Sequence, residues 1–462
     1  MSNAYANAPI VEARNSGLIF CVDAAMVPST TTFTGTDMMQ GLTEWETGTA
    51  GIGNWGQNGS TSENSRVKDT DPYGNRSVLW RAFNNDASSG ADGGWNGSSF
   101  SVDKANLFRW SRFVKVANQG SNGTIYGGLY GVGNSMLRWD NRNTQGNPYD
   151  YCNARSGYTT GVWYLAISYV FPHGTVAGGG GSPYTSDYGF YPFNTKTRTT
   201  SGFGCNTGGN TIFNDSQTGL SEREYLYYST DPAVDVYWHR PNCFLVNGSE
   251  PSIDELLTSE QNVWIDQSGN AINMRARYTS TGPPALTRTG PAYFTFNGVD
   301  SYFKGPNDTV LDVTDQLTVQ AWVNPDTLAQ NGHIFEKGEV NTQFSMFLNS
   351  DSVFYWRVHI DGSTRNLTPA TSSVCPASTW TLVTCTYDGS QQKIYSNGAL
   401  VTSRSQTGDI STNTLNTWIG CYGNAGAYFF DGKIAAVRVY NKSLTQDEIV
   451  KQFNAQRDRF QV

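Results

Sequence analysis

Charged residues are scarce in this chain of 462 residues. Asp, Glu, Lys and Arg make up 15% of the sequence, against roughly 25% in an average soluble domain. The 31 Lys and Arg are outnumbered by 39 Asp and Glu, and nowhere do four basic residues stand together. Because binding to nucleic-acid phosphates needs clustered cations, we expect no nucleic-acid partner.

Long apolar runs are missing as well. No stretch of the sequence approaches the ~18 apolar residues that are needed to span a membrane. The first residues, 1–9, lack both the basic segment and the apolar segment of a secretory signal. We therefore expect a protein that is made in the cytoplasm and does not insert into a membrane.

Motifs for metal binding and nucleophilic catalysis are also absent. The seven cysteines include no Cys-x-x-Cys pair, which predicts free buried thiols rather than a disulfide framework. None of the four histidines, His173, His239, His333 and His359, lies within five residues of another. The sequence predicts no metal, no cofactor and no catalytic residue, although a triad that forms only in space stays open.

Two groups of carboxylates are candidates for a catalytic or a calcium site. Glycanases often place three carboxylates on one strand, alternating so that all point into the cleft. Glu222 and Glu224 have the right spacing but lack the middle Asp, so we predict a solvated strand entrance. Residues 69–75 offer Asp and Asn side chains, but Pro72 and Tyr73 stand where an EF-hand needs a ligand, which favours a turn.

Glycine and aromatic residues are abundant, with 49 Gly and 13% aromatics. This composition is typical of short strands joined by tight turns, so we predict an all-β protein. Leu317 to Pro325 alternates apolar and polar residues, as a half-buried strand does. Asp388-Gly389 and Asn397-Gly398 then separate further strand-like runs, and both dipeptides favour two-residue hairpin turns.

One helix is expected at the end of the chain. Thr445 and Glu448 form the sequence pattern of a capping box, and Leu444 and Ile449 stand at the staple positions. Phe453 follows Ile449 by four residues, which gives the helix an apolar stripe. We expect this short C-terminal helix to pack on the edge of a sandwich.

The second half of the chain resembles the laminin-G-like, concanavalin A-like jelly-roll family. The resemblance lies in five segments that occur in the family's order: Phe296 to Tyr302, Leu317 to Pro325, Trp380 to Gly389, Tyr395 to Gly398 and Gly432 to Ile449. It implies a β-sandwich. It implies no single activity, because this fold hosts lectins, glycanases and structural modules.

The first strand of this module is expected far upstream. Val263 to Asn270 looks like the turn that follows the first strand in such modules. In phage-borne members that strand reads Gly-Leu-Val-x-x-x-Asp-Ala, and Gly17 to Ala25 matches it. We therefore predict that residues 30–257 are inserted into a discontinuous laminin-G-like domain made of residues 10–29 and 258–462.

The inserted segment is predicted to be a second jelly-roll sandwich. Strand-like runs such as Arg76 to Phe83 and Val162 to Val170 are punctuated by Gly and Pro stretches. Several of its motifs are similar to a carbohydrate-binding-like domain of tailed-phage structural proteins. These are Glu63 to Val67, Asp71 to Gly74, Ala91 to Trp95, Phe108 to Ser111 and Glu250 to Leu257.

One departure from the laminin-G-like pattern bears on calcium. The family usually carries an acidic pair in a Gly-x-Asp-Asp-Tyr stretch, where this chain has Asp300-Ser301. Asn297 stands where the family has an Asp before the Gly. We expect these to be turn residues that bind their own backbone rather than calcium ligands.

Exposed aromatic residues are the remaining candidates for a binding site. Sugars stack their C–H faces on Trp and Tyr, while neighbouring amides and carboxylates bind the hydroxyls. Trp55, Trp95, Trp139 and Tyr149 lie in Gly-, Asn- and Asp-rich stretches, so they are the predicted glycan-binding residues. The alternative for each is a place in a jelly-roll core.

Together the resemblances imply a virion protein of a tailed bacteriophage. We expect a non-enzymatic tail-fibre or appendage component on the virion surface, whose partners are other virion proteins and host-surface glycan. A capsid decoration protein is an alternative, since the sequence has no heptads and no short repeat of a fibre stalk. A polysaccharide depolymerase is a further alternative, against which the missing carboxylate string counts.

Overall fold

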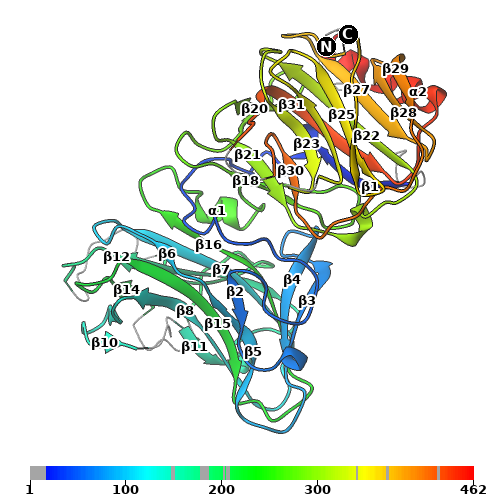
Figure 1. Ribbon diagram of the computed structural model, residues 1–462. Helices are drawn as coiled ribbons and strands as arrows, with labels where there is room; N and C mark the ends of the chain where they lie inside the picture. Colours follow the sequence, from blue (N-terminus) through cyan, green and yellow to red (C-terminus); the bar gives the residue numbers. More distant parts are fainter. Residues whose placement is uncertain are drawn as a thin grey trace. The chain divides into compact units, whose positions relative to one another are not determined.

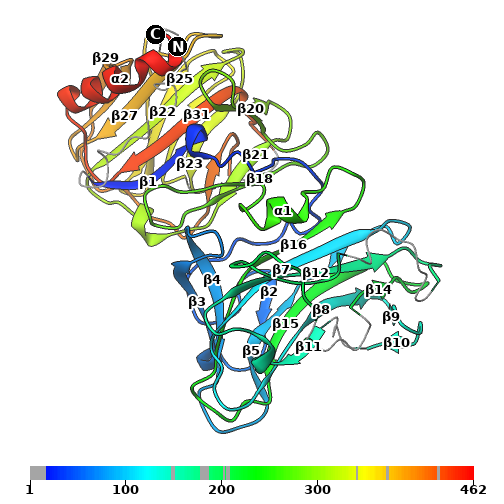
Figure 2. The same cartoon turned by 180° about the vertical axis from the view of Figure 1, so that it is seen from behind.

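The computed structural model describes residues 17–146, 151–176, 187–200, 203, 209–339, 342–370, 374–423 and 427–462. The chain forms two compact units, which Figures 1 and 2 show from opposite sides. Unit 1 joins the segment up to Phe33 with Gln261–Val462, and unit 2 is Thr34–Glu260. The chain thus leaves unit 1 after its first strand and returns to it, with junctions three or four residues beyond the predicted 30–257.

Unit 1 contains two antiparallel sheets in its described part. The first runs in the order β19 (Ala285–Thr287), β20 (Tyr293–Asn297), β31 (Asp431–Tyr440), β22 (Leu317–Pro325), β27 (Thr381–Tyr387), β28 (Gln391–Ser396) and β29 (Ala399–Ser405). The second runs β17 (Val263–Trp264), β18 (Met274–Arg277), β21 (Tyr302–Gly305), β30 (Thr417–Ile419), β23 (His333–Lys337), β24 (Phe344–Leu348), β25 (Phe354–Ile360) and β26 (Ser363–Leu367). The apolar faces of both sheets share one core.

The first strand of the chain belongs to unit 1. β1 (Leu18–Asp23) pairs antiparallel with β31, with Phe20 opposite Val439 and Val22 opposite Val437. The side chains of Phe20 and Val22 are fully buried in the unit 1 core. The sheet therefore gains a strand and part of its core from a segment more than two hundred residues away from the rest of the unit in sequence.

The helix at the end of the chain covers one face of the first sheet. α2 (Gln446–Phe460) begins after Thr445, and the capping box with Glu448 is formed as predicted. Trp322 donates its indole N–H to Oε1 of Gln456 at 2.7 Å, and its ring stacks on Phe460 with the centroids 4.0 Å apart. Both faces of β22 are buried for this reason, although its alternating sequence predicted one exposed face.

Unit 2 is also built from two sheets in its described part. The larger runs β10 (Thr144–Gln145), β9 (Met136–Arg138), β14 (Thr211–Ile212), β12 (Trp163–Phe171), β7 (Phe108–Asn118), β16 (Asp235–Leu245), β4 (Arg76–Phe83) and β3 (Asn64–Thr70), with β13 (Gly189–Pro192) beside β12. The smaller runs β11 (Tyr151–Ala154), β8 (Thr124–Val132), β15 (Gly219–Tyr227), β5 (Ala91–Gly97) and β2 (Trp55–Gln57), with β6 (Phe100–Ser101) beside β15. A short helix, α1 (Ile253–Leu256), follows β16.

The predicted fold class is confirmed. The described part of the chain is nearly all β, with two antiparallel sheets in unit 1, two mainly antiparallel sheets in unit 2 and a short C-terminal helix. Five cysteines in the described ranges, Cys21, Cys243, Cys375, Cys385 and Cys421, are buried and free, as expected. No helix within those ranges is long and apolar enough to cross a bilayer.

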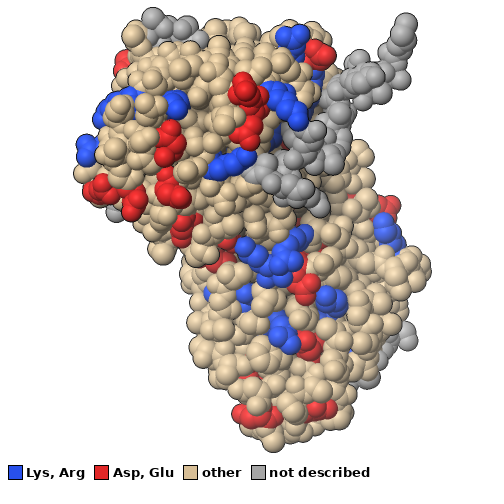
Figure 3. All heavy atoms as spheres, turned by 90° about the vertical axis from the view of Figure 1, so that its right-hand side faces the viewer, with Lys and Arg blue, Asp and Glu red and all other residues tan. Residues whose placement is uncertain are grey.

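Charged side chains are sparse on the face that Figure 3 shows. There, Lys and Arg lie among Asp and Glu, and most of the surface is neither. No broad field of one sign is visible on that face. Recognition through such a surface depends on shape, aromatic contact and hydrogen bonds more than on net charge.

Candidate functional site

Two of the predicted glycan-binding residues lie in the core of unit 2. Trp55 and Trp95 are 0% exposed, and their rings meet edge to face with centroids 5.8 Å apart. Trp45 and Trp238 pack against Trp95 in the same cluster. The expectation that Trp55 and Trp95 are exposed was wrong. Their Gly- and Asn-rich neighbours suggested loops, but the two rings fill the space between the two sheets.

The other two predicted glycan-binding residues, Trp139 and Tyr149, do not supply an open aromatic surface in the described part of unit 2. Trp139 is 9% exposed and stacks on Phe171 with the ring centroids 4.2 Å apart, so one ring face is already covered. Tyr149 lies outside the described residues. The aromatic residues chosen from the sequence of unit 2 therefore do not form an open binding surface in its described part.

The two carboxylates of β15 are buried, which corrects the predicted solvated strand entrance. Glu222 and Glu224 are both 0% exposed and alternate onto the inner face of the sheet. Nε of Arg112 lies 3.1 Å from Oε1 of Glu224, and the indole N–H of Trp95 donates to Glu222. Burial and the neighbouring Glu224 raise the pKa of Glu222 well above its usual value, which favours its neutral form.

The stretch around Asp71 forms the predicted turn. Its Oδ1 accepts hydrogen bonds from the backbone N–H groups of Tyr73 and Asn75, each at 2.9 Å. Oδ2 accepts from the hydroxyl of Ser77 at 2.8 Å. The loop between β3 and β4 is thus an Asx turn, not an EF-hand-like calcium loop.

Asp300 is likewise held by its own neighbourhood. Its Oδ2 accepts from the backbone N–H groups of Thr279, Ser280 and Thr281, and its Oδ1 accepts from the side chains of Thr281 and Asn297. These donors hold the pKa of Asp300 far below its usual range, although burial opposes them. Asp300 stands where the family carries an acidic pair. Backbone and side-chain donors surround its carboxylate, and they compensate its negative charge without a cation.

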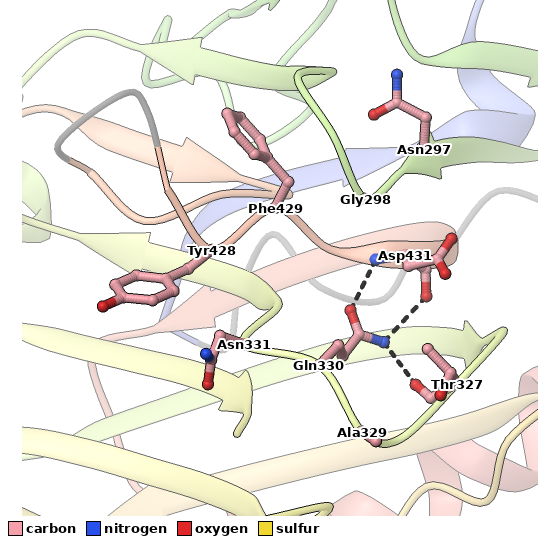
Figure 4. Close-up of a pocket in the computed structure, with 9 residues that line it drawn as sticks. All are labelled: Asn297, Gly298, Thr327, Ala329, Gln330, Asn331, Tyr428, Phe429 and Asp431. Atoms are coloured by element: carbon pink, nitrogen blue, oxygen red, sulfur yellow. Dashed lines mark hydrogen bonds between the residues drawn. The ribbon is translucent and has the colours of Figure 1, made fainter. Parts of the chain in front are cut away.

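A pocket opens in unit 1 where three loops meet. It encloses about 420 Å³ and lies beside the turn after β20, the loop after β22 and the entry to β31. We call it the loop pocket (Figure 4). It is lined by Asn297, Gly298, Thr327, Ala329, Gln330, Asn331, Tyr428, Phe429 and Asp431.

Gln330 fixes two of these loops to each other. Its side-chain amide N–H groups donate to the carbonyl oxygens of Thr327 at 2.6 Å and Asp431 at 3.0 Å. Its Oε1 accepts from the backbone N–H of Asp431 at 2.7 Å. Because the amide is used on both sides, as the dashed lines of Figure 4 show, Gln330 acts as a brace for the pocket wall rather than as a ligand contact.

The turn at the third wall depends on Asn297 and Gly298. Oδ1 of Asn297 accepts from the backbone N–H groups of Val299, Asp300 and Ser301 at 2.9 to 3.1 Å. Gly298 has φ of 68°, and a Cβ added there would lie 2.9 Å from Cβ of Asp431. A residue without a side chain is therefore needed where this turn meets β31.

Tyr428 supplies an exposed aromatic ring at the mouth of the loop pocket. The residue is 48% exposed and has φ of 62°, a left-handed conformation that Tyr adopts rarely. Its carbonyl oxygen accepts from the backbone N–H of His333 at 3.1 Å, and its ring lies 5.7 Å from that of Tyr422. The backbone is therefore held in a conformation that leaves the side chain about half exposed, and in Figure 4 the ring points away from Asp431.

The aromatic contacts continue from Tyr428 across the second sheet. The ring of His333 stacks on Phe347 at 4.5 Å with an interplanar angle of 4°, and Phe347 stacks on Tyr355 at 4.9 Å. The guanidinium of Arg357 lies over the Phe347 ring, 4.7 Å from its centroid. This row of rings stiffens the platform from which Tyr428 projects.

Two polar side chains of the loop pocket remain available for a ligand. Oδ1 of Asn331 accepts from the backbone N–H of Ser350 at 2.9 Å, which leaves its amide NH₂ as a donor. The carboxylate of Asp431 has no hydrogen-bond partner among the described residues. Burial and the nearby Asp326 raise its pKa, and Lys433 lowers it. An exposed ring, an amide donor and a carboxylate acceptor thus line one pocket, and these are groups with which proteins bind sugars.

Of the residues that line the loop pocket, sequence reasoning singled out Asn297, as a turn residue, and missed Tyr428, Asn331 and Asp431. Tyr428 and Phe429 stand just before the β31 strand, in a stretch that the strand pattern treated as a connection. The pocket forms only because the loops at 297–298, 327–331 and 428–431 meet in space. The three consecutive aromatic residues Tyr428, Phe429 and Phe430, which do not alternate with polar residues, were the signal available.

Residues 297–450 match the family model of the concanavalin A-like lectin/glucanases superfamily. The match includes every residue that lines the loop pocket. No curated protein matches the chain. The chain resembles several solved structures, all at low identity.

One similar structure is the binding domain of botulinum neurotoxin serotype G, with 15% identity, 42% of this chain and 48% of that chain covered, and a TM-score of 0.35. Another is domain 4 of AbnA, a GH43 extracellular arabinanase from Geobacillus stearothermophilus, in complex with arabinotriose. The two sequences are 21% identical, the match covers 40% of this chain and 90% of that chain, and the TM-score is 0.32. The chain spans about half the length of the toxin domain. At these TM-scores the likenesses support no conclusion about function.

Proposed function

We propose that this chain is a non-enzymatic glycan-binding protein whose binding site is the loop pocket of unit 1. The observation that carries the proposal is Tyr428, an exposed ring on a rigid support beside Asn331 and Asp431. The ring would stack on a sugar face, while the amide and the carboxylate would bind hydroxyl groups. The match of this segment to a superfamily of lectins and glucanases supports the same chemistry.

We further propose that the protein acts on the surface of a tailed-bacteriophage virion, as a tail-fibre or appendage component that attaches to host-surface glycan. The support is the resemblance of Gly17 to Ala25 and of the unit 2 motifs to phage structural proteins. A shallow pocket of this kind binds one sugar weakly. Many copies on one particle would raise the overall affinity without any new contact.

Capsid decoration is the alternative that one observation favours. The sequence has no heptads and no short repeat of the kind that builds a fibre stalk. In that case the other virion proteins, rather than a glycan, would contact the surfaces of the two units. Binding of the purified chain to purified capsids, compared with binding to tails of the same particles, distinguishes the two locations.

The non-enzymatic part of the proposal rests on the placement of the carboxylates. Glu222 and Glu224 would be the pair for a depolymerase, but they lie in the core of unit 2, where no polysaccharide reaches them. Among the described residues that line the loop pocket, Asp431 is the one acidic side chain. Hydrolysis of a glycoside usually needs two carboxyl groups across the scissile bond.

A glycan array tests the binding site. Tyr428→Ala and Asp431→Asn should each weaken binding, with the Tyr change costing ~1 to 3 kcal/mol, the scale of one aromatic contact at a hot spot. Tyr228→Ala is the matched control, since Tyr228 is a Tyr of unit 2 with the same φ of 62° and is 55% exposed. Glycan binding that survives both pocket changes, or that is lost with Tyr228→Ala instead, would place the site elsewhere.

A further inference from the structure

Three side chains that are distant in sequence meet inside unit 2. Asp71 lies in the turn between β3 and β4, His239 lies on β16, and Glu260 lies beyond α1. All three residues are buried, and each offers one ligand atom within 4.8 Å of the others. Both views of the ribbon show α1 beside β16, and Tyr73 ties the turn to α1 by donating its hydroxyl to the carbonyl oxygen of Leu256 at 2.8 Å.

His239 is the member whose surroundings point to a ligand. It is 2% exposed and stands where β16 departs from regular register with β7. Nε2 lies 3.0 Å from Oε1 of Glu260, yet neither ring nitrogen has a hydrogen-bond partner within the described part of the chain. The imidazole is therefore buried with Nε2 facing Oε1 of Glu260, where a bound cation would contact both atoms.

The carboxylate of Asp71 is held in position near His239 and Glu260. Its two oxygens are oriented by Tyr73, Asn75 and Ser77, and a carboxylate oxygen that accepts one hydrogen bond keeps a lone pair for a second partner. Ligand carboxylates in metal sites are commonly oriented by such hydrogen bonds. The Asx turn and a metal contact are thus compatible uses of one side chain.

The charges of the three groups do not balance by themselves. Two buried carboxylates face one imidazole, which carries at most one positive charge. Unbalanced charge is costly in a buried place, and a divalent cation would neutralise both carboxylates.

The donor set indicates the class of cation. One imidazole nitrogen and two carboxylate oxygens suit zinc and related transition metals, whereas calcium takes six to eight oxygens. Bonds of about 2.0 to 2.1 Å in a tetrahedron place ligand atoms roughly 3.3 Å apart, and the His239–Glu260 separation of 3.0 Å is close to that. Rings of Tyr73 and Phe113 lie 6.1 and 5.6 Å from the imidazole and shield it from water.

We propose that Asp71, His239 and Glu260 bind a divalent transition-metal cation of the zinc class, with one position left for water. The site would be structural. It would join the β3–β4 turn, the β16 strand and the residue with which unit 2 ends, so that the metal closes unit 2 where the chain leaves it.

The full chain, purified in the presence of a chelator and then freed of it, is titrated with Zn²⁺ by calorimetry and with Co²⁺ by visible absorption. We expect one equivalent of Zn²⁺, competition between the two metals, and Co²⁺ bands of a four-coordinate site. Excess Zn²⁺ should raise the Tm of unit 2 by roughly 5 °C or more. A wild-type chain that binds neither metal, or binds several equivalents weakly without a change in Tm, would overturn the proposal.

Variants assign the metal to the three residues. His239→Gln and Glu260→Gln should each lower Zn²⁺ affinity by at least a hundredfold and remove the Tm rise. His359→Gln is the control, because His359 lies on β25 of unit 1, where Nδ1 of its ring lies 3.4 Å from the hydroxyl oxygen of Thr364. If His239→Gln does not fold, Asp71→Asn replaces it, since its Oδ1 still accepts the turn hydrogen bonds. Stoichiometric Zn²⁺ binding that persists in the folded variants would refute this assignment.

Discussion

Arg112 and Glu224 form an ion pair in the core of unit 2, with 3.1 Å between Nε and Oε1 and side-chain exposures of 1% and 0%. The guanidinium also lies 3.6 Å from the centroid of the Trp110 ring. Glu222 lies two residues from Glu224 on the same strand and face. One guanidinium thus lies near two buried carboxyl groups, and the pKa of Glu222 is raised by its burial. We therefore expect the stability of unit 2 to depend on pH.

Replacing Glu222 by Gln should remove that dependence. The pKa of Glu222 is raised in the folded state, mainly by burial and then by Glu224, so the folded protein binds a proton that the unfolded chain releases. The stabilisation is complete below the usual value of 4.5 and is lost as pH rises toward the folded pKa. The Tm of Glu222→Gln minus that of the wild type should therefore grow from pH 5 to pH 8 in thermal scans.

Glu224→Gln is the informative partner variant. It leaves the buried Arg112 without its counter-charge, and breaking such a pair costs about 3 to 5 kcal/mol. Unit 2 should therefore lose stability at every pH from 5 to 8. If Glu222→Gln is as destabilising as Glu224→Gln, or if its Tm difference does not change with pH, then Glu222 is ionised in the folded protein and our assignment is wrong.

Asp300→Asn should destabilise unit 1 even when no calcium is present. The donors of Thr279, Ser280 and Thr281 hold the wild-type carboxylate, and hydrogen bonds to a charged group contribute about 1.5 to 3 kcal/mol each. Because the pKa of Asp300 is lowered, this contribution is present above the unfolded value and is lost as pH falls through the folded one. Denaturant unfolding of both proteins at pH 7 measures the difference.

Calcium and a chelator provide the control for that experiment. Wild-type unit 1 should unfold at the same denaturant concentration with either addition, because backbone and side-chain donors already surround the carboxylate. A clear stabilisation by calcium that disappears in Asp300→Asn would show that a cation binds at this turn after all.

Removal of the first strand should weaken unit 1. A chain that starts at Gly48 lacks β1, so one edge of β31 loses its partner along Phe20 to Asp23. The exposed edge and the missing Phe20 and Val22 side chains should speed amide hydrogen exchange in β31 and lower its cooperative stability. Protection of β31 equal to that in the full chain would mean that unit 1 folds without its first strand.

The sequence by itself determined the elements whose signals are local. The Asn397-Gly398 hairpin turn and the capping box of α2 depend on residues a few positions apart, and both formed as expected. The turn at Asp388-Gly389 is longer than the predicted two residues, because the pairing of β27 with β28 ends at Tyr387 and Gln392. The turn around Asp71 is also local, because its acceptor and its backbone donors lie within five residues. Physical rules that act over one turn or one strand can be applied to a sequence directly.

Tertiary structure alone decided which polar and aromatic residues are buried. Trp55, Trp95, Glu222 and Glu224 stand in stretches that look exposed, and they are buried because a second sheet covers them. The loop pocket and the cluster of Asp71, His239 and Glu260 each join segments that lie more than a hundred positions apart in the sequence. Burial and convergence depend on how the sheets stack, and no local pattern of residues encodes that stacking.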